Sequence, residues 1–227
     1  MRNWFWLVGS LALSATAAAQ GPLPARVEIE YELKRNGSTM AEVEDVLEQA
    51  NGNYRLTERW KGRGLYALLG RAKRTSEGTL GPNGPRPGEY VDERSGRDTQ
   101  RVSFDWTANT ITRRYKGRTT TEAVPADTQD RLSFLFVLTF VSPNGQPVSF
   151  HVADGRGMSR HTYEPVGRER VHTPAGEFDC LKVMRRNGSG DVAEIWLAAN
   201  RSYLPVRIVV VEKDGTRYEH IATRMSP

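Results

Sequence analysis

The chain has 227 residues, which is enough for one all-β domain or two small ones with a sizeable core. Lys and Arg number 32 against 27 for Asp and Glu, so the formal net charge is +5. Because this modest charge is spread along the chain, composition argues against a nucleic-acid partner, which requires basic residues clustered on one face.

Residues 1–19 are predicted to be a cleaved secretory signal peptide. Arg2 supplies the positive charge, Trp4–Leu13 the apolar stretch and Ala17-Ala18-Ala19 a small-residue cleavage site. The apolar stretch is shorter than the ~20 residues that cross a bilayer. The residue directly after the cleavage site is Gln20 and not the cysteine that lipid attachment requires. We therefore expect a periplasmic protein that is not a lipoprotein, with a short lead-in over residues 20–26.

Residues 27–225 are predicted to form a single antiparallel β domain. Val27–Lys34 alternates apolar and polar residues, as a half-buried strand does, and Asn36-Gly37 after it is a strong hairpin signal. Met40–Ala50 also fits a helical spacing, and that alternative stays open. Turn residues on both sides of the segment favour a strand.

Further strands alternate with turns rich in Gly, Pro and Asn. Turns recur about every 8–12 residues, which is typical of a sandwich or barrel. Gly81–Gly88 is expected to be a long rigid loop inside the domain. The further strands are Tyr54–Trp60, Glu89–Arg94, Arg101–Trp106, Thr110–Tyr115, Val148–Val152, Met158–Pro165, Arg168–His172, Phe178–Arg186, Val192–Leu197, Val206–Lys213 and Arg217–Met225.

The longest apolar run outside the leader is Gln129–Val141. It is apolar on nearly every face, which predicts a buried helix over about residues 128–141. Asp127 or Thr128 is the expected cap, with Asp130 in the first turn. A doubly buried strand stays open as the alternative. The predicted fold is thus mainly β, an antiparallel meander forming a barrel or half-barrel with one buried or covering helix.

No arrangement of residues in the sequence predicts catalysis. Cys180 is the only cysteine, and its strand-like setting predicts a buried, inert thiol. His151, His161, His172 and His220 lack metal-ligand spacing, and neither a serine-nucleophile motif nor a phosphate-binding loop occurs. We expect a non-catalytic protein without metal or cofactor. A hydrolase whose site is assembled from distant residues is the enzymatic alternative.

Arg55–Arg74 is a basic stretch that contains one acidic residue, Glu58. Apolar and aromatic residues are interleaved with the basic ones, a pattern that can dock on an anionic membrane surface or an envelope protein partner. The alternative is a pair of strands with solvated arginines. The predicted basic surface consists of Arg55, Arg59, Lys61, Arg63, Arg71, Lys73 and Arg74.

Several short segments follow one another in a distinctive order. They are the basic stretch at Trp60–Leu69, Asp130-Arg131-Leu132-Ser133, Thr173-Pro174-Ala175-Gly176-Glu177-Phe178, Glu194-Ile195-Trp196-Leu197-Ala198, Leu204-Pro205-Val206-Arg207 and Asp214-Gly215. Together they resemble the bacterial "domain of unknown function 3108" family, from about Val27 to Met225. Asn200 departs from the family pattern, in which an aspartate is expected. The resemblance implies an exported, envelope-associated β-protein, a barrel or half-barrel around a helix, with no established activity and no catalytic residues to carry over.

Export, many strands and one apolar helix predict a protein that holds an apolar or amphiphilic envelope ligand, a lipid or glycolipid, inside its curved sheet. The same side chains can instead fill the interior without a cavity. An envelope assembly or interaction partner that acts through the basic surface is the second hypothesis. The candidate ligand-lining residues are Trp60, Leu65, Tyr66, Phe134, Phe136, Leu138 and Trp196.

Overall fold

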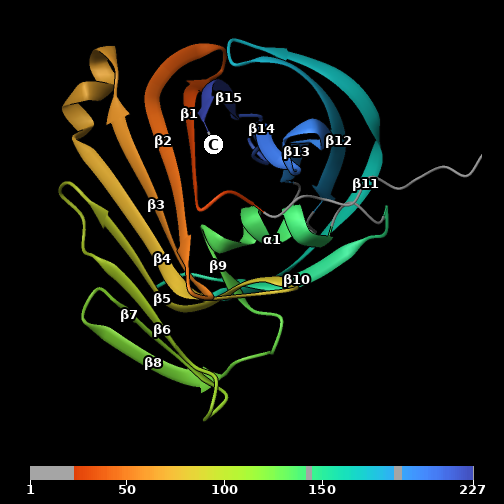
Figure 1. The fold of residues 1–227 in the computed structure, drawn as a ribbon. Helices are drawn as coiled ribbons and strands as arrows, with labels where there is room; N and C mark the ends of the chain where they lie inside the picture. Colours follow the sequence, from red (N-terminus) through yellow and green to blue (C-terminus); the bar gives the residue numbers. More distant parts are fainter. Residues whose placement is uncertain (1–22, 142–144, 187–190, 227) are drawn as a thin grey trace, which may run out of the picture.

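The computed structural model describes residues 23–141, 145–186 and 191–226, so the predicted signal peptide at 1–19 lies outside the described residues. The described chain forms a 15-stranded sheet that curls around one α-helix, α1 (Ser133–Val141), as Figure 1 shows. All neighbouring strands are antiparallel except β9 and β10. The prediction of an antiparallel half-barrel with one helix is therefore confirmed.

The sheet consists of two meanders that meet where the first strand, β1, pairs with the last, β15. The first meander contains β1 (Arg26–Arg35), β2 (Ser38–Ala50), β3 (Asn53–Gly62), β4 (Arg71–Gly81), β5 (Gly84–Arg94), β6 (Gln100–Asp105), β7 (Thr110–Tyr115) and β8 (Arg118–Ala123). The second contains β9 (Gln129–Asp130), β10 (Val148–Ala153), β11 (Met158–Thr173), β12 (Gly176–Arg186), β13 (Val192–Ala198), β14 (Leu204–Val211) and β15 (Arg217–Ser226). Two short 3₁₀ helices are η1 (Gly64–Leu69) and η3 (Ala199–Arg201).

The ambiguous segment Met40–Ala50 is a strand, as predicted, because β1 and β3 pair with it on both sides. The prediction of a long loop at Gly81–Gly88 is wrong, because a tight turn joins β4 to β5 and most of these residues belong to β5. Pro85 and Pro87 lie in the part of β5 that does not pair with β6. Proline has no backbone N–H to donate, and on the β6 side of this part there is no strand that would need one.

The helix begins later than predicted. Residues 129 and 130 form β9, which pairs in parallel with β10, and the cap is Asp130 and not Asp127 or Thr128. Asp130 Oδ1 accepts hydrogen bonds from the backbone N–H of Leu132 at 2.8 Å and of Ser133 at 2.9 Å. The N–H of Asp130 donates in return to Ser133 Oγ at 2.9 Å. This reciprocal pair satisfies the first donors of the helix, as a capping box does.

Side chains tie the start of α1 to the opposite wall of the sheet. Ser76 Oγ on β4 donates to Asp130 Oδ2 at 2.5 Å, and Gln129 Nε2 donates to the carbonyl oxygen of Pro85 on β5 at 3.1 Å. These contacts connect the two ends of the curved wall without a backbone ladder. Strands β6 to β8 continue past this seam as a flap (Figure 1).

Candidate functional site

A row of charged side chains crosses the inner face of the first meander. Strand register places Asp45 opposite Glu58, Glu58 opposite Arg74, and Arg74 opposite Asp92, so the four share one face of the sheet. The three carboxylates are buried, and the side chain of Arg74 is 17% exposed. We call Asp45, Glu58, Arg74 and Asp92 the charged belt.

Most charges in the belt are paired. Arg74 contacts Glu58 Oε1 through Nη1 at 2.8 Å and Asp92 Oδ2 through Nε at 3.3 Å. Arg94 also donates hydrogen bonds to Asp92, at 2.8–3.2 Å. Asp45 is the exception, because its Oδ1 has no hydrogen-bond partner within the protein. Burial and the neighbouring charge of Glu58 raise the pKa of Asp45 well above its usual range, so this position favours the protonated, uncharged carboxyl.

A cavity of about 300 Å³ lies against the belt and has two unlike walls. The belt forms the polar wall. The opposite wall is apolar and comes from Phe134 and Leu135 of α1 and from Ile208 and Val210 of β14. At the rim, the side chain of Arg131 is 52% exposed and Arg156 is exposed, so the cavity opens to solvent on that side. The buried end is formed by Tyr31, Trp60, Tyr90 and His220.

Buried polar atoms without a partner converge on this cavity. Eight such side-chain atoms occur in the described residues, and four of them, Asp45 Oδ1, Trp60 Nε1, Tyr90 OH and His220 Nδ1, belong to residues that line it. Each unsatisfied buried group costs about 1–3 kcal/mol, and native interiors satisfy most of them. Their concentration in one place is typical of a site completed by a bound molecule or ordered water.

His220 belongs to an aromatic cluster at the buried end. Its ring centroid lies 6.0 Å from that of Tyr31 and 6.0 Å from that of Trp60, edge-on in both cases. Arg74 Cζ lies 5.2 Å from the centroid of the Trp60 ring. Burial and the positive charge of Arg74 lower the pKa of His220 to about 4, so the imidazole is neutral at neutral pH.

Beside the paired charges of the belt, the cavity therefore also has neutral hydrogen-bonding residues. Burial raises the pKa of Tyr90, which keeps its hydroxyl protonated, and the indole N–H of Trp60 is a neutral donor. An unpaired ionic group placed beside them would lose its hydration without gaining a counter-ion. The site thus suits an uncharged group that both donates and accepts hydrogen bonds.

The structure brings two of the predicted ligand-lining residues, Trp60 and Phe134, to this cavity. Phe136 and Leu138 are buried in the hydrophobic core. Leu65 is 86% exposed on η1 and does not line the interior, because η1 joins β3 to β4 outside the curved wall. Tyr66, also on η1, lines only a small hollow of about 150 Å³ under that helix.

Trp196, the seventh predicted residue, also does not line the cavity. It is buried like Ile195, but it lies on the opposite face of β13. Its ring is sandwiched between Lys182 Nζ at 4.6 Å and Arg207 Cζ at 4.7 Å from the centroid. Its indole N–H donates to Glu169 Oε1 at 2.5 Å. Trp196 thus stabilises the outer face of the second meander.

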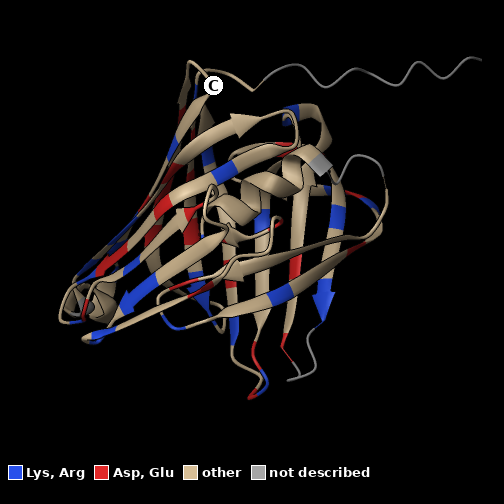
Figure 2. Ribbon diagram, turned by 90° about the horizontal axis from the view of Figure 1, so that it is seen from below, with Lys and Arg blue, Asp and Glu red and all other residues tan. Residues whose placement is uncertain are grey.

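The predicted basic surface is partly neutralised by neighbouring strands. Arg55 pairs with Glu77 at 3.0 Å and Arg59 with Glu44 at 2.8 Å, and Arg63 pairs with Glu42. Figure 2 shows charges of both signs on the strands. Arg74 points inward and belongs to the belt. The unpaired members of the predicted basic surface are Lys61, Arg71 and Lys73, which have no carboxylate within 4 Å in the described ranges.

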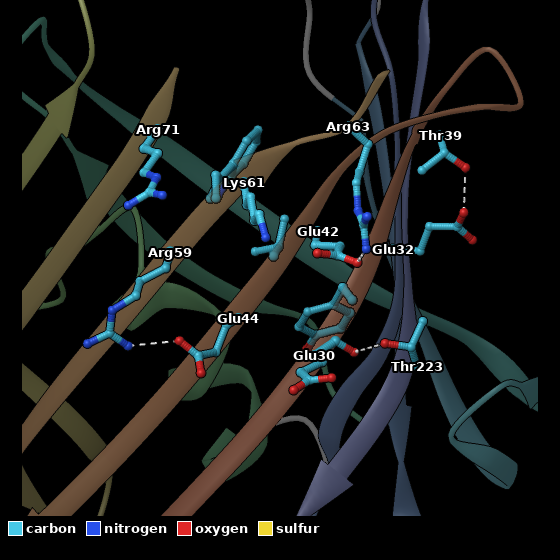
Figure 3. A pocket seen from close by; sticks show the side chains of 13 residues that line it. Glu30, Glu32, Thr39, Glu42, Glu44, Arg59, Lys61, Arg63, Arg71 and Thr223 are labelled. Carbon is cyan, nitrogen blue, oxygen red and sulfur yellow. Dashed lines mark hydrogen bonds and ion pairs between the residues drawn. The ribbon is translucent and has the colours of Figure 1, made fainter. Parts of the chain in front are cut away.

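A groove of about 860 Å³ along β1 to β4 is larger than the interior cavity. Figure 3 shows carboxylates of β2 facing basic side chains, with Arg59 of β3 directed at Glu44 and Arg63, which follows β3, directed at Glu42. Arg59 and Arg63 are exposed and already paired, so these two ion pairs add little binding energy, and the groove is open to solvent. We therefore regard the smaller interior cavity as the candidate site.

Sequence reasoning overlooked most of the cavity. The missed residues of the belt and buried end include Asp45, Asp92, Tyr90 and His220. A signal exists for one of them, since Asp45 stands between Val43 and Leu47 at an inward position of an alternating strand. Among the described residues, no three His, Cys, Asp or Glu side chains gather in a way that holds a metal ion.

Cys180 is buried, and burial raises the pKa of its thiol to about 12. The thiol is therefore un-ionised and inert at neutral pH, as its setting in the sequence predicts.

The curled sheet and its interior cavity define a β-barrel-like protein whose strand ring is not closed. The chain belongs to the family described as "Protein of unknown function (DUF3108)", which matches residues 28–221. No curated protein matches the sequence. None of the helices in the described residues is both long enough and apolar enough to cross a bilayer.

Solved structures are similar to this chain at low sequence identity. The crystal structure of a β-barrel-like protein of domain of unknown function DUF1849 from Brucella abortus has a TM-score of 0.54 and 9% identity, covering 89% of this chain and 97% of that chain. A protein from Parabacteroides distasonis provisionally described as a lipoprotein has a TM-score of 0.39 and 12% identity, covering 90% and 97%. MucB has a TM-score of 0.34 and 14% identity, covering 89% and 53%. The first likeness supports the barrel-like fold.

Proposed function

We propose that this protein is a non-catalytic periplasmic binding protein for an amphiphilic cell-envelope ligand, whose uncharged polar part enters the interior cavity. The observation that carries the proposal is the gathering around one cavity of four residues with an unpartnered buried polar atom, namely Asp45, Trp60, Tyr90 and His220. A ligand with hydroxyl or amide groups would form hydrogen bonds with donors and acceptors that have no partner within the protein.

The contrast between the two cavity walls supports an amphiphilic ligand. A wholly apolar molecule would cover Phe134 and Ile208 but leave the polar wall unsatisfied. A strongly charged group would need a counter-ion, yet the cations Arg74 and Arg94 are already paired with the carboxylates Glu58 and Asp92. A sugar-like or amide-bearing head group beside an apolar segment matches both walls.

The size of the cavity limits what it can hold. About 300 Å³ is at the lower end of small-molecule sites and equals the liquid volume of about ten water molecules. It suits a head group and not a long acyl chain. Phe136, Leu138 and other core side chains fill much of the remaining interior. The apolar part of the ligand would then continue toward the open rim at Arg131 and Arg156.

Replacing Trp60 by Phe should reduce ligand retention about tenfold, because a hydrogen bond of about 1–1.5 kcal/mol is lost while ring packing is kept. The measurement is the fraction of purified protein that carries an added mass in native mass spectrometry.

Trp106→Phe is the matched control, since its indole N–H already donates to the carbonyl oxygen of Pro87 at 2.7 Å and Trp106 does not line the cavity. Equal ligand occupancy in the two variants would contradict the proposed site.

A further inference from the structure

The helix η1 carries a conspicuous apolar surface. Leu65 is 86% exposed and Leu68 is 88% exposed, and they are two of the three large hydrophobic residues exposed in the described chain. The third is Val166 on β11, at 50%. Residues three apart in a 3₁₀ helix lie on the same side, so Leu65 and Leu68 form one apolar edge.

Close packing holds η1 in a fixed pose. A Cβ at Gly62 would lie 2.2 Å from the carbonyl oxygen of Tyr66, and a Cβ at Gly70 would lie 2.4 Å from Ser95 Cβ. Only glycine fits at either end of the helix, and Gly70 also has a φ of +78°. Tyr66 lies over the hollow lined by Met40 and Trp60. The leucines are therefore held outward by the packing of the opposite side.

Basic residues lie near the apolar edge. Lys61 and Arg71 flank η1 in sequence and have no carboxylate within 4 Å in the part of the chain that the structure describes. Arg71 and Arg97 line the hollow beneath the helix, while Arg63, which precedes it, is paired with Glu42. An apolar edge with unpaired cations beside it matches a bilayer surface whose acyl chains lie beneath anionic head groups.

We propose that η1 docks the protein onto anionic membrane surfaces, with Leu65 and Leu68 at the boundary between head groups and acyl chains and with Lys61 and Arg71 against lipid phosphates. This inference does not depend on a ligand in the interior cavity. The η1 helix joins the ends of β3 and β4, away from α1 in Figure 1. The leucine edge can therefore reach a membrane without rearrangement of the barrel.

The test is sedimentation of the mature full-length protein with vesicles of phosphatidylcholine alone or of phosphatidylcholine with about one-third phosphatidylglycerol. Binding is expected to the anionic vesicles and to weaken at high salt, because surface charges are screened. The variant Leu65→Ser/Leu68→Ser should bind at least about tenfold more weakly for each leucine replaced. Lys61→Glu/Arg71→Glu should lose binding to anionic vesicles while remaining folded.

Two control variants match these changes elsewhere on the surface. Val166→Ser removes the other exposed apolar side chain, and Arg118→Glu/Arg201→Glu makes the same change in net charge at exposed sites on β8 and η3. Both should bind like the unmodified chain. Equal loss in the η1 and control variants, or no vesicle binding by the unmodified chain, would overturn the proposal. Capture of a protein partner through η1 without vesicle binding would overturn it as well.

Discussion

Replacing Arg74 by Met should lower the free energy of unfolding by about 3–5 kcal/mol, the usual cost of removing one partner from a buried ion pair. Arg74 bridges Glu58 and Asp92 on the strands at either side, and both carboxylates are buried. The substitution leaves them facing one another in the interior without the cation between them. Urea unfolding at pH 7 measures the change.

Arg55→Met is the matched control, because Arg55 lies on the same β-ladder but faces outward. Its pair with Glu77 is 53% and 46% exposed, so the cost should stay within about 1 kcal/mol. The variant Glu58→Gln/Arg74→Met/Asp92→Asn removes the stranded charges and should recover part of the loss. The belt would have no structural role if Arg74→Met cost no more than Arg55→Met.

The loss of unfolding free energy caused by Arg74→Met should also become smaller at acidic pH. Although burial opposes ionisation of Asp92, hydrogen bonds from Arg94 and the charges of Arg74 and Arg94 hold its pKa below the usual value. Without Arg74, Asp92 loses part of the interaction that stabilises its ionised form. Protonation in acid then removes the unfavourable buried negative charge. The difference in stability between variant and unmodified chain should therefore narrow below about pH 5.

Asp130→Ala should cost about 2–4 kcal/mol. A lost helix cap costs about 1 kcal/mol, and stranded buried hydroxyls add about 1–3 kcal/mol. Ser76 Oγ, which donates to Asp130, is itself hydrogen-bonded to the Tyr54 hydroxyl at 2.8 Å. Asp105→Ala is the control, since Asp105 accepts two backbone N–H groups in an exposed turn. Similar losses of unfolding free energy in the two variants would show that the hydrogen bond from Ser76 to Asp130 adds no stability beyond the helix cap.

Ionisation of Asp130 gives this position its own pH dependence. Burial raises the pKa of Asp130 to about 6. An unfolded aspartate titrates near about 3.9, so folding favours the protonated form. That stabilisation is fully present below the unfolded pKa and is lost as pH rises through about 6, a change of about 3 kcal/mol. Relative to Asp130→Asn, the unmodified chain should lose stability from pH 4 to pH 7. Parallel stability curves would contradict the assignment.

Local patterns predict most of the strands, but they do not define every boundary. The alternation in Val27–Lys34 follows directly from one buried face. Every residue of β8 is exposed, so no alternation marks Arg118–Ala123 as a strand. Gln129 and Asp130 look helical in sequence, yet pairing with β10 and the bond from Ser76 place them before the helix. Such boundaries depend on partners far away along the chain.

The candidate site depends on register, which the sequence does not display. Asp45, Glu58, Arg74 and Asp92 are spread over 48 sequence positions and meet because three hairpins align them. The same alignment explains the basic surface: Arg59 looks unpaired within its own strand, but Glu44 lies opposite on β2. Segment charge alone therefore overestimates how basic a sheet surface is.

The segment Asp130-Arg131-Leu132-Ser133 illustrates how a family resemblance acquires a physical meaning. Asp130 and Ser133 form the reciprocal cap of α1, and Arg131 pairs with Asp154 at 3.2 Å on the rim of the cavity. The segment thus begins the helix, closes the barrel wall and borders the candidate site. A structural role explains its residues without any catalytic function.

Native mass spectrometry of the protein, purified without detergent from the cells that express it, tests the central claim most directly. The account predicts a discrete added mass that is lost on denaturation and that extracts as an amphiphile with an uncharged hydroxyl- or amide-bearing head group. Trp60→Phe should lower its occupancy, and Trp106→Phe should not. A bare protein mass in every preparation would contradict the account and would assign the cavity to water.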